Sequence, residues 1–190
     1  MNLQTATQVI FGISALALFY TYVGYPVLVY LVSLIRPLKV KRSDFEPNVT
    51  VIITAYNEAQ DIRGKLENTI KIDYPKGKLD ILVASDGSTD ETDEIVKEFA
   101  SHGVRLFRQE GRVGKTYTQN KAVEQAKGEI ILFSDATTMY QTDVLREMLP
   151  SFADKTIGCV AGKLIYVDKG NTNIGQGAKS YWNYETFIKE

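Results

Sequence analysis

The stretch NVTVIITAY, residues 48–56, decides how this chain folds. It has the length of one strand and is rich in β-branched residues, which favour extended backbone. Its apolar residues are too continuous for a strand that exposes one face to water. A strand of this kind is covered on both faces, which is typical of a parallel sheet that lies between helices.

Outward from residues 48–56, apolar runs of strand length alternate with segments of helical spacing. The expected strands cover 48–56, 79–85, 104–109, 129–134 and 157–167. The expected helices cover 59–72, 90–101, 115–127, 142–153 and 177–189. This alternation predicts an α/β fold with a mostly parallel sheet and helices on both faces.

The first 35 residues differ from the rest because they contain no charged side chain. Residues 9–35 are almost wholly apolar or aromatic, and as a helix they would be roughly 40 Å long, more than the ~30 Å hydrocarbon core of a bilayer. A cleaved signal peptide is the alternative, but no basic segment precedes the apolar one and no small-x-small cleavage site follows it. We therefore predict a transmembrane anchor over 1–36, a basic linker over 37–47 and a domain over 48–190.

Positive charge predicts the orientation of this anchor. Four basic residues follow it and none precedes it: Arg36, Lys39, Lys41 and Arg42. Because positively charged flanks stay on the cytoplasmic side, we expect a cell-membrane protein with its N-terminus outside and its domain in the cytoplasm. The single cysteine, Cys159, excludes an internal disulfide, and its apolar neighbours predict that it is buried.

Polar loops gather on one predicted edge of the sheet. The loops AYNE, SDGSTD, EGRVGKT and SDATT follow the carboxyl ends of the first four strands, whereas the opposite loops, such as DYPKGK and AKGE, are plain connectors. Ligands of parallel sheets bind beyond the carboxyl ends of the strands. The net charge of -1 gives no support for nucleic-acid binding, so a smaller ligand is expected there.

The side chains on this edge suit a divalent metal and a phosphate-bearing ligand. They are Glu58, Asp86, Arg112, Lys115 and Asp135. Mg²⁺ prefers one or two carboxylates together with phosphate oxygens. A lysine at a helix start favours phosphate. A P-loop is the alternative for GRVGKT, but Gln109 stands where that motif needs its first glycine.

Four motifs resemble those of a known family. VTVIITAYNE (49–58), YPKGKLDILVASDGSTDET (74–92), GRVGKTYTQN (111–120) and FSDATTMY (133–140) are similar to family 2 glycosyltransferases. The resemblance covers about residues 48 to 190. It implies the GT-A fold and an enzyme that uses nucleotide sugars, and the family includes processive membrane polysaccharide synthases.

The resemblance also assigns roles to donor-binding residues. Tyr56 and Glu58 match the first nucleotide-binding loop, and Asp86 matches the aspartate that recognises the nucleotide base. Arg112 and Lys115 match the basic loop near the diphosphate. The implied donor is a nucleotide-diphosphate sugar, UDP-linked by family habit.

Asp135 matches the first aspartate of the metal-binding Asp-x-Asp, which implies a Mg²⁺ or Mn²⁺ cofactor. This sequence departs from the pattern at Thr137, a neutral and weaker ligand in the second position. It departs again at Ser85, where many members carry a further aspartate. The first departure places the expected metal affinity on Asp135 and the phosphates of the donor, and the second implies different contacts with the nucleotide base.

The implied reaction is an inverting transfer of the sugar to a saccharide or lipid-linked acceptor at the cytoplasmic membrane face. The family's base lies in a motif after the last residue, Glu190, so we expect the N-terminal part of a longer enzyme that is inactive by itself. One alternative is a non-catalytic nucleotide-sugar-binding protein or membrane scaffold, favoured by the missing base and by Thr137. A nucleotidyltransferase is the other, but it needs a Gly- and Arg-rich loop where this chain has AYNEAQDIRGK.

Overall fold

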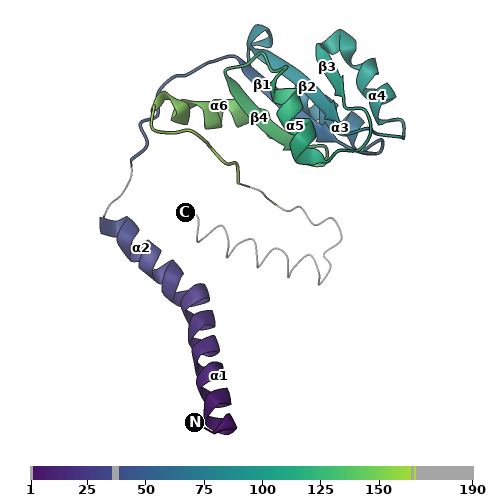
Figure 1. Ribbon diagram of the computed structural model, residues 1–190. Coiled ribbons are helices and arrows are strands. Elements are labelled where there is room, and N and C mark those ends of the chain that lie inside the picture. The colour runs from purple at the N-terminus through teal and green to yellow at the C-terminus, as the bar shows by residue number, and fades with distance from the viewer. Residues whose placement is uncertain (1, 36–38, 164, 166–190) are drawn as a thin grey trace. The chain divides into compact units, whose positions relative to one another are not determined.

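A computed structural model describes residues 2–35, 39–163 and 165 (Figure 1). The chain divides into two compact units, of which one is Met1–Val40 with Ala161–Glu190 and the other is Lys41–Val160. The second unit contains the whole sheet and the candidate site.

The N-terminal unit contains a long apolar helix. It is built of α1 (Leu3–Phe19), a π-helical turn (Tyr20–Gly24) and α2 (Tyr25–Ile35). The Asn2 side chain caps it by accepting the Thr5 N–H at 2.8 Å. The π-helical turn ends two residues before Pro26, whose missing N–H interrupts the regular helical ladder. Residues 3–35 are long and apolar enough to cross a membrane, judged by length and composition.

Four parallel strands form the sheet of the second unit. They are β1 (Val49–Ala55), β2 (Leu79–Ser85), β3 (Val104–Arg108) and β4 (Ile130–Asp135), in the order β3-β2-β1-β4. This arrangement confirms the mostly parallel sheet expected from the sequence. The order reverses at β1, since β2 and β3 lie on one side of it and β4 on the other. Such a reversal is where parallel sheets open a crevice for ligands.

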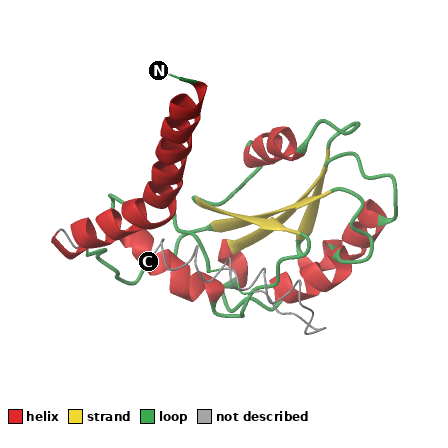
Figure 2. Cartoon of the chain, turned by 90° about the horizontal axis from the view of Figure 1, so that it is seen from below, coloured by secondary structure: helices red, strands yellow, loops and turns green. Residues whose placement is uncertain are grey.

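Helices cover both faces of this sheet (Figure 2). On one face, α3 (Ile62–Ile70) and α4 (Thr92–Glu98) pack against alternate strand residues such as Val51 and Ile53. On the other face, Ala122 of α5 (Lys115–Val123) packs against Ile52 and Leu82. Consecutive residues of β1 are thus buried on opposite faces, which explains the uninterrupted apolar run.

The remaining helical elements are short. They are α6 (Val144–Met148) and the 3₁₀ turns Lys76–Lys78, Ala100–His102 and Leu149–Ala153. The helix expected over 142–153 is divided because Pro150 cannot continue a regular α-helix. Leu145 of α6 and Leu149 of the 3₁₀ turn after it pack against Val49 and Tyr74 at the amino end of the sheet.

The strand expected over 157–167 was wrong for 157–163 and 165, the part of it that the structure describes. The described strands do not pair with this segment, and a strand without a neighbour leaves its backbone groups unpaired. Cys159 in this segment is exposed, so its expected burial was wrong as well. The helix expected over 177–189 lies outside the described residues.

The segment that precedes β1 contacts the domain. The Lys41 N–H donates to the Asp154 carboxylate at 3.2 Å, and the Ser43 N–H donates to the Pro150 carbonyl at 3.3 Å. The Tyr74 hydroxyl donates to the Pro47 carbonyl at 2.5 Å. The part of the predicted linker from Lys41 onward therefore lies against the 3₁₀ turn that follows α6.

Candidate functional site

The predicted site residues lie at one edge of the sheet. Tyr56 and Glu58 follow β1, Asp86 follows β2, and Asp135 is the last residue of β4. The register pairs Thr54 with Asp135 and Ala55 with Ser85, so the three strands end at the same level. Arg112 and Lys115 reach this edge from the loop between β3 and α5.

Asp86 ties the start of α5 to the end of β2. Its carboxylate accepts the Val113 N–H at 3.0 Å, the Gly114 N–H at 2.9 Å and the Thr118 hydroxyl at 2.8 Å. Only 3% of Asp86 is exposed, and burial opposes its charge. The hydrogen bonds outweigh burial and hold the pKa of the Asp86 carboxyl below its usual value. The carboxylate is therefore ionised and fixed in place.

The loop after β2 and the loop between β3 and α5 approach each other through their backbones. Gly87 has a φ of +70°, and a Cβ placed on it would lie 2.5 Å from the carbonyl carbon of Gly111. Real Cβ atoms essentially never approach backbone so closely. Glycine at position 87 thus permits both the left-handed backbone and the contact.

Arg112 and Lys115 connect the loop between β3 and α5 with the ends of β1 and β4. The Arg112 guanidinium carbon lies 4.3 Å from the centroid of the Tyr56 ring, a cation–π distance. The Lys115 ammonium lies 2.5 Å from Asp135 Oδ1, and about half of each side chain is exposed. Because Gly114 contacts Asp86 and the next residue contacts Asp135, the two aspartates lie on the same side of the molecule.

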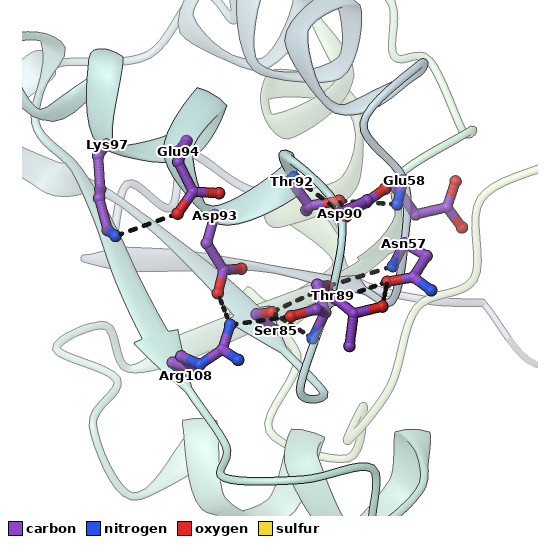
Figure 3. Close-up of polar contacts among 11 residues, drawn as sticks. Asn57, Glu58, Ser85, Thr89, Asp90, Thr92, Asp93, Glu94, Lys97 and Arg108 are labelled. Atoms are coloured by element: carbon purple, nitrogen blue, oxygen red, sulfur yellow. Dashed lines mark hydrogen bonds and ion pairs between the residues drawn. The ribbon is translucent and has the colours of Figure 1, made fainter.

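The loop after β1 is held by the loop after β2 (Figure 3). The Thr89 N–H donates to the Asn57 side chain at 2.8 Å, and the Glu58 N–H donates to the Thr92 hydroxyl at 2.8 Å. Asp90 accepts the Ala59 N–H at 3.1 Å. The Glu58 carboxylate points away from these contacts in Figure 3.

Glu58 feels the charges of three other carboxylates. Burial raises the pKa of the Glu58 carboxyl, and the charges of Asp61, Asp135 and Asp90 raise it further. Repulsion between these carboxylates would fall if a cation bound among them. The site therefore favours a cation near Glu58 and Asp135.

Asp135 and Thr137 fit a metal that is shared with a phosphate. Both are exposed, whereas Ala136 between them is 2% exposed and packs in the core. No group of three or more His, Cys, Asp or Glu side chains surrounds a common point among the described residues. The chain thus offers one carboxylate and one hydroxyl, and Mg²⁺ or Mn²⁺ fits such a pair when phosphate oxygens and waters complete its shell.

Sequence reasoning missed Lys65 in α3, which is fully buried. Ile62, Lys65, Leu66 and Thr69 are the buried residues of this helix, so the lysine lies within an otherwise apolar or neutral stripe. A lysine at a core position of an amphipathic helix is the signal that could have found it. Its contacts reach the segment that follows Asp135.

The fold defines an α/β domain of the GT-A class, and the carboxyl edge of its parallel sheet carries basic residues beside an aspartate. A family model described as Glycosyl transferase family 2 matches residues 50–190. The chain belongs to this family.

Curated relatives support the same family. The glycosyltransferase AglE of Haloferax volcanii is 26% identical over 141 residues, which are 73% of this chain and 46% of AglE. The probable glycosyltransferase YdaM of Bacillus subtilis is 31% identical over 66% of this chain and 31% of YdaM. The chain therefore spans less than half the length of these relatives.

Two solved structures share the fold. The mannosyltransferase PcManGT of Pyrobaculum calidifontis, in complex with GDP-Man and Mn²⁺, has a TM-score of 0.68 and 34% identity over 78% of this chain and 47% of that one. TarS of S. aureus, in complex with UDP-GlcNAc, has a TM-score of 0.51 and 29% identity over 53% of this chain and 29% of that one.

Proposed function

We propose that the site binds the diphosphate of a nucleotide sugar and, within a membrane-anchored glycosyltransferase, presents the sugar for inverting transfer to a saccharide or lipid-linked acceptor. One observation carries this proposal: the consecutive residues Gly114 and Lys115 contact Asp86 and Asp135, which joins both ends of the site. A nucleoside diphosphate has a base at one end and a charged diphosphate at the other. On this edge, Asp86 suits the base, and Lys115 and Asp135 suit the diphosphate and its metal.

The basic residues supply the charge that a diphosphate requires. Lys115 stands at the N-terminus of α5, so its ammonium and the positive end of the helix act together on an anion. Arg112 lies beside Tyr56, and this pair of a guanidinium and an aromatic ring supports a role in binding phosphate and base. A divalent ion held by Asp135 and Thr137 would supply further positive charge to the leaving diphosphate.

The Asp86 carboxylate keeps one acceptor position that a base could use. A carboxylate has about four acceptor positions. Asp86 Oδ1 accepts from Val113, Gly114 and Thr118, whereas Oδ2 accepts only from Gly114. The remaining position on Oδ2 suits an imide N–H such as that of uracil, in agreement with the role that the resemblance assigns.

We further propose that the apolar helix over residues 3–35 anchors the enzyme, with the N-terminus outside and the domain at the cytoplasmic face. The proposal is supported by the length and composition of the helix. It is also supported by the basic residues after it, among them Lys39 and Lys41.

A non-catalytic nucleotide-sugar-binding protein is the second candidate function. The neutral Thr137 in the second metal position favours it, because a hydroxyl is a weaker ligand than a carboxylate. The catalytic base, which the resemblance places beyond residue 190, stays a prediction. Sugar transfer to an acceptor by the full-length enzyme, lost in Asp135→Ala, would decide for the catalytic function.

Calorimetric titration tests donor binding. The chain in detergent is titrated with UDP-glucose, UDP-GlcNAc and GDP-mannose, each with and without Mn²⁺. We expect one donor to bind in a Mn²⁺-dependent manner, with affinity at least about tenfold weaker in Asp135→Ala, because a carboxylate ligand is lost. Asp44→Ala, at an exposed position of the segment before β1, is the control and should bind as the wild type does. Equal affinity with and without the metal would contradict the proposal.

A further inference from the structure

Lys65 of α3 places a cation inside the protein. Its side chain is fully buried, and its ammonium donates a hydrogen bond to the Thr138 carbonyl. The nitrogen lies 3.9 Å from the centroid of the Tyr140 ring. Among the described residues no carboxylate forms an ion pair with Lys65, and its ammonium contacts a carbonyl and an aromatic ring.

A buried ammonium without a carboxylate partner is costly. Burial lowers the pKa of Lys65 to about 8, although the charge of Asp135 opposes this change. An apolar side chain of similar length would fill the same space without that cost. The position of the lysine therefore needs a reason other than core packing.

The partners of Lys65 belong to the segment that carries the proposed metal ligands. One turn further along α3, the Asn68 side chain donates to the Tyr140 carbonyl at 2.9 Å and accepts the Tyr140 N–H at 2.8 Å. Ala136 is buried in the cluster that contains Ile62. Helix α3 thus holds residues 136, 138 and 140 from the core side, and Asp135 and Thr137 remain exposed.

We propose that Lys65 is a positioning residue for the metal-binding turn, which it holds through the Thr138 carbonyl so that Asp135 and Thr137 face a divalent cation together. The inference rests on the proposed function, because it presupposes a metal at Asp135. Lys65 contacts neither donor nor metal, since its side chain is fully buried.

The sign of the effect on metal affinity distinguishes positioning from simple electrostatics. A cation near Asp135 repels a divalent ion, so removal of its charge would tighten metal binding if Coulomb forces alone acted. If Lys65 positions the turn, removal of its hydrogen bond weakens metal binding. The two explanations therefore predict opposite changes for the same substitution.

The test measures Mn²⁺ affinity by electron paramagnetic resonance on the chain in detergent, with and without UDP. Lys65→Met keeps the length of the side chain and removes the donor, and we expect about tenfold weaker Mn²⁺ binding, the size of one hydrogen bond to a charged group. Lys65→Gln keeps a donor without the charge and should lie between Lys65→Met and the wild type. Lys71→Met, an exposed position at the end of the same helix, is the control and should change affinity less than twofold.

Asn68→Ala provides a second test that alters no charge. It removes both contacts to Tyr140 and should also weaken Mn²⁺ binding, with circular dichroism confirming the fold of each variant. Unchanged or tighter binding in Lys65→Met, with a wild type that binds Mn²⁺, overturns the role of Lys65 and leaves the proposed function intact. A folded wild type that binds no Mn²⁺, with or without UDP, overturns both the role of Lys65 and the proposed function.

Discussion

Gly87 lies so close to the backbone of Gly111 that no Cβ fits between them. This approach brings the loop after β2 against the loop that carries Arg112 and Lys115. Asp86, directly before Gly87, holds that same loop through the Val113 and Gly114 amides. The position of Arg112 and Lys115 therefore depends on glycine at position 87, because a larger residue would push their loop away.

We expect Gly87→Ala to lower the free energy of unfolding by about 2–3 kcal/mol, because the new methyl meets backbone at a positive φ. It should also weaken nucleotide-sugar binding, since the loop that carries Arg112 must move. Gly77→Ala is the matched control, because a Cβ at position 77 has no atom within 4 Å. Thermal unfolding and calorimetry measure both effects, and equal stability of the two variants would contradict the expectation.

Among the elements, β1 determines where the others lie. It pairs with β2 and with β4, and it is covered by α3 and α5 on opposite faces. At its amino end, the Thr50 hydroxyl donates to Asp80 of β2 at 2.9 Å, and Asp80 accepts from Arg105 of β3 at 2.8 and 2.7 Å. One partly buried carboxylate thus joins three strands at the edge opposite the site.

Asp80→Asn should lower the free energy of unfolding at pH 7 by about 1–2 kcal/mol, because charge-assisted hydrogen bonds are lost. Burial opposes the charge of Asp80, but its bonds with Arg105 and Thr50 outweigh burial and lower its pKa. A lowered pKa stabilises the fold above the unfolded pKa of about 4, and this contribution is lost as pH falls through the folded value. The difference between wild type and Asp80→Asn should therefore shrink below about pH 4.

Asp73→Asn is the matched control for this measurement. Asp73 pairs with Arg146, but both side chains are more than half exposed. Its substitution should change stability by less than about 0.5 kcal/mol at pH 7. If Asp73→Asn destabilised the protein as much as Asp80→Asn does, burial of the Asp80 hydrogen bonds would not explain the loss of stability in Asp80→Asn.

At the scale of the whole molecule, an apolar helix precedes a domain whose surface carries the site. The helix over residues 3–35 has no charged side chain, whereas the domain follows a basic segment. A membrane orientation follows from this asymmetry as a prediction. The single cysteine, Cys159, is exposed in the second unit and can report that orientation.

A membrane-impermeant maleimide should leave Cys159 unlabelled in intact cells and label it in inverted membrane vesicles, because we place the domain in the cytoplasm. A variant with Cys159→Ser and Asn2→Cys carries the reporter at the N-terminus and should show the reverse pattern. Mass spectrometry of the purified protein measures the labelled fraction. Labelling of Cys159 in intact cells would reverse the proposed orientation.

Asp135 and Lys65 show how far sequence reasoning reached. Asp135 could be found because it ends an apolar strand, and parallel strands bring their carboxyl ends to one edge whatever the details of packing. Lys65 could not be found, because its role depends on which segment α3 packs against. Residues 64–65 and 138–140 are far apart in the sequence, and only the packing of α3 against the turn after β4 brings them together.

The sequence by itself determined the alternation of strands and helices, the parallel sheet, the apolar N-terminal helix and the family, because hydrophobic periodicity and loop composition are local properties of a chain. Only the tertiary structure decided the order β3-β2-β1-β4, the contact of Asp86 with the start of α5 and the burial of Lys65. These features depend on pairing between segments distant in sequence. Local patterns do not specify such pairing, because it is selected by the packing of the whole core.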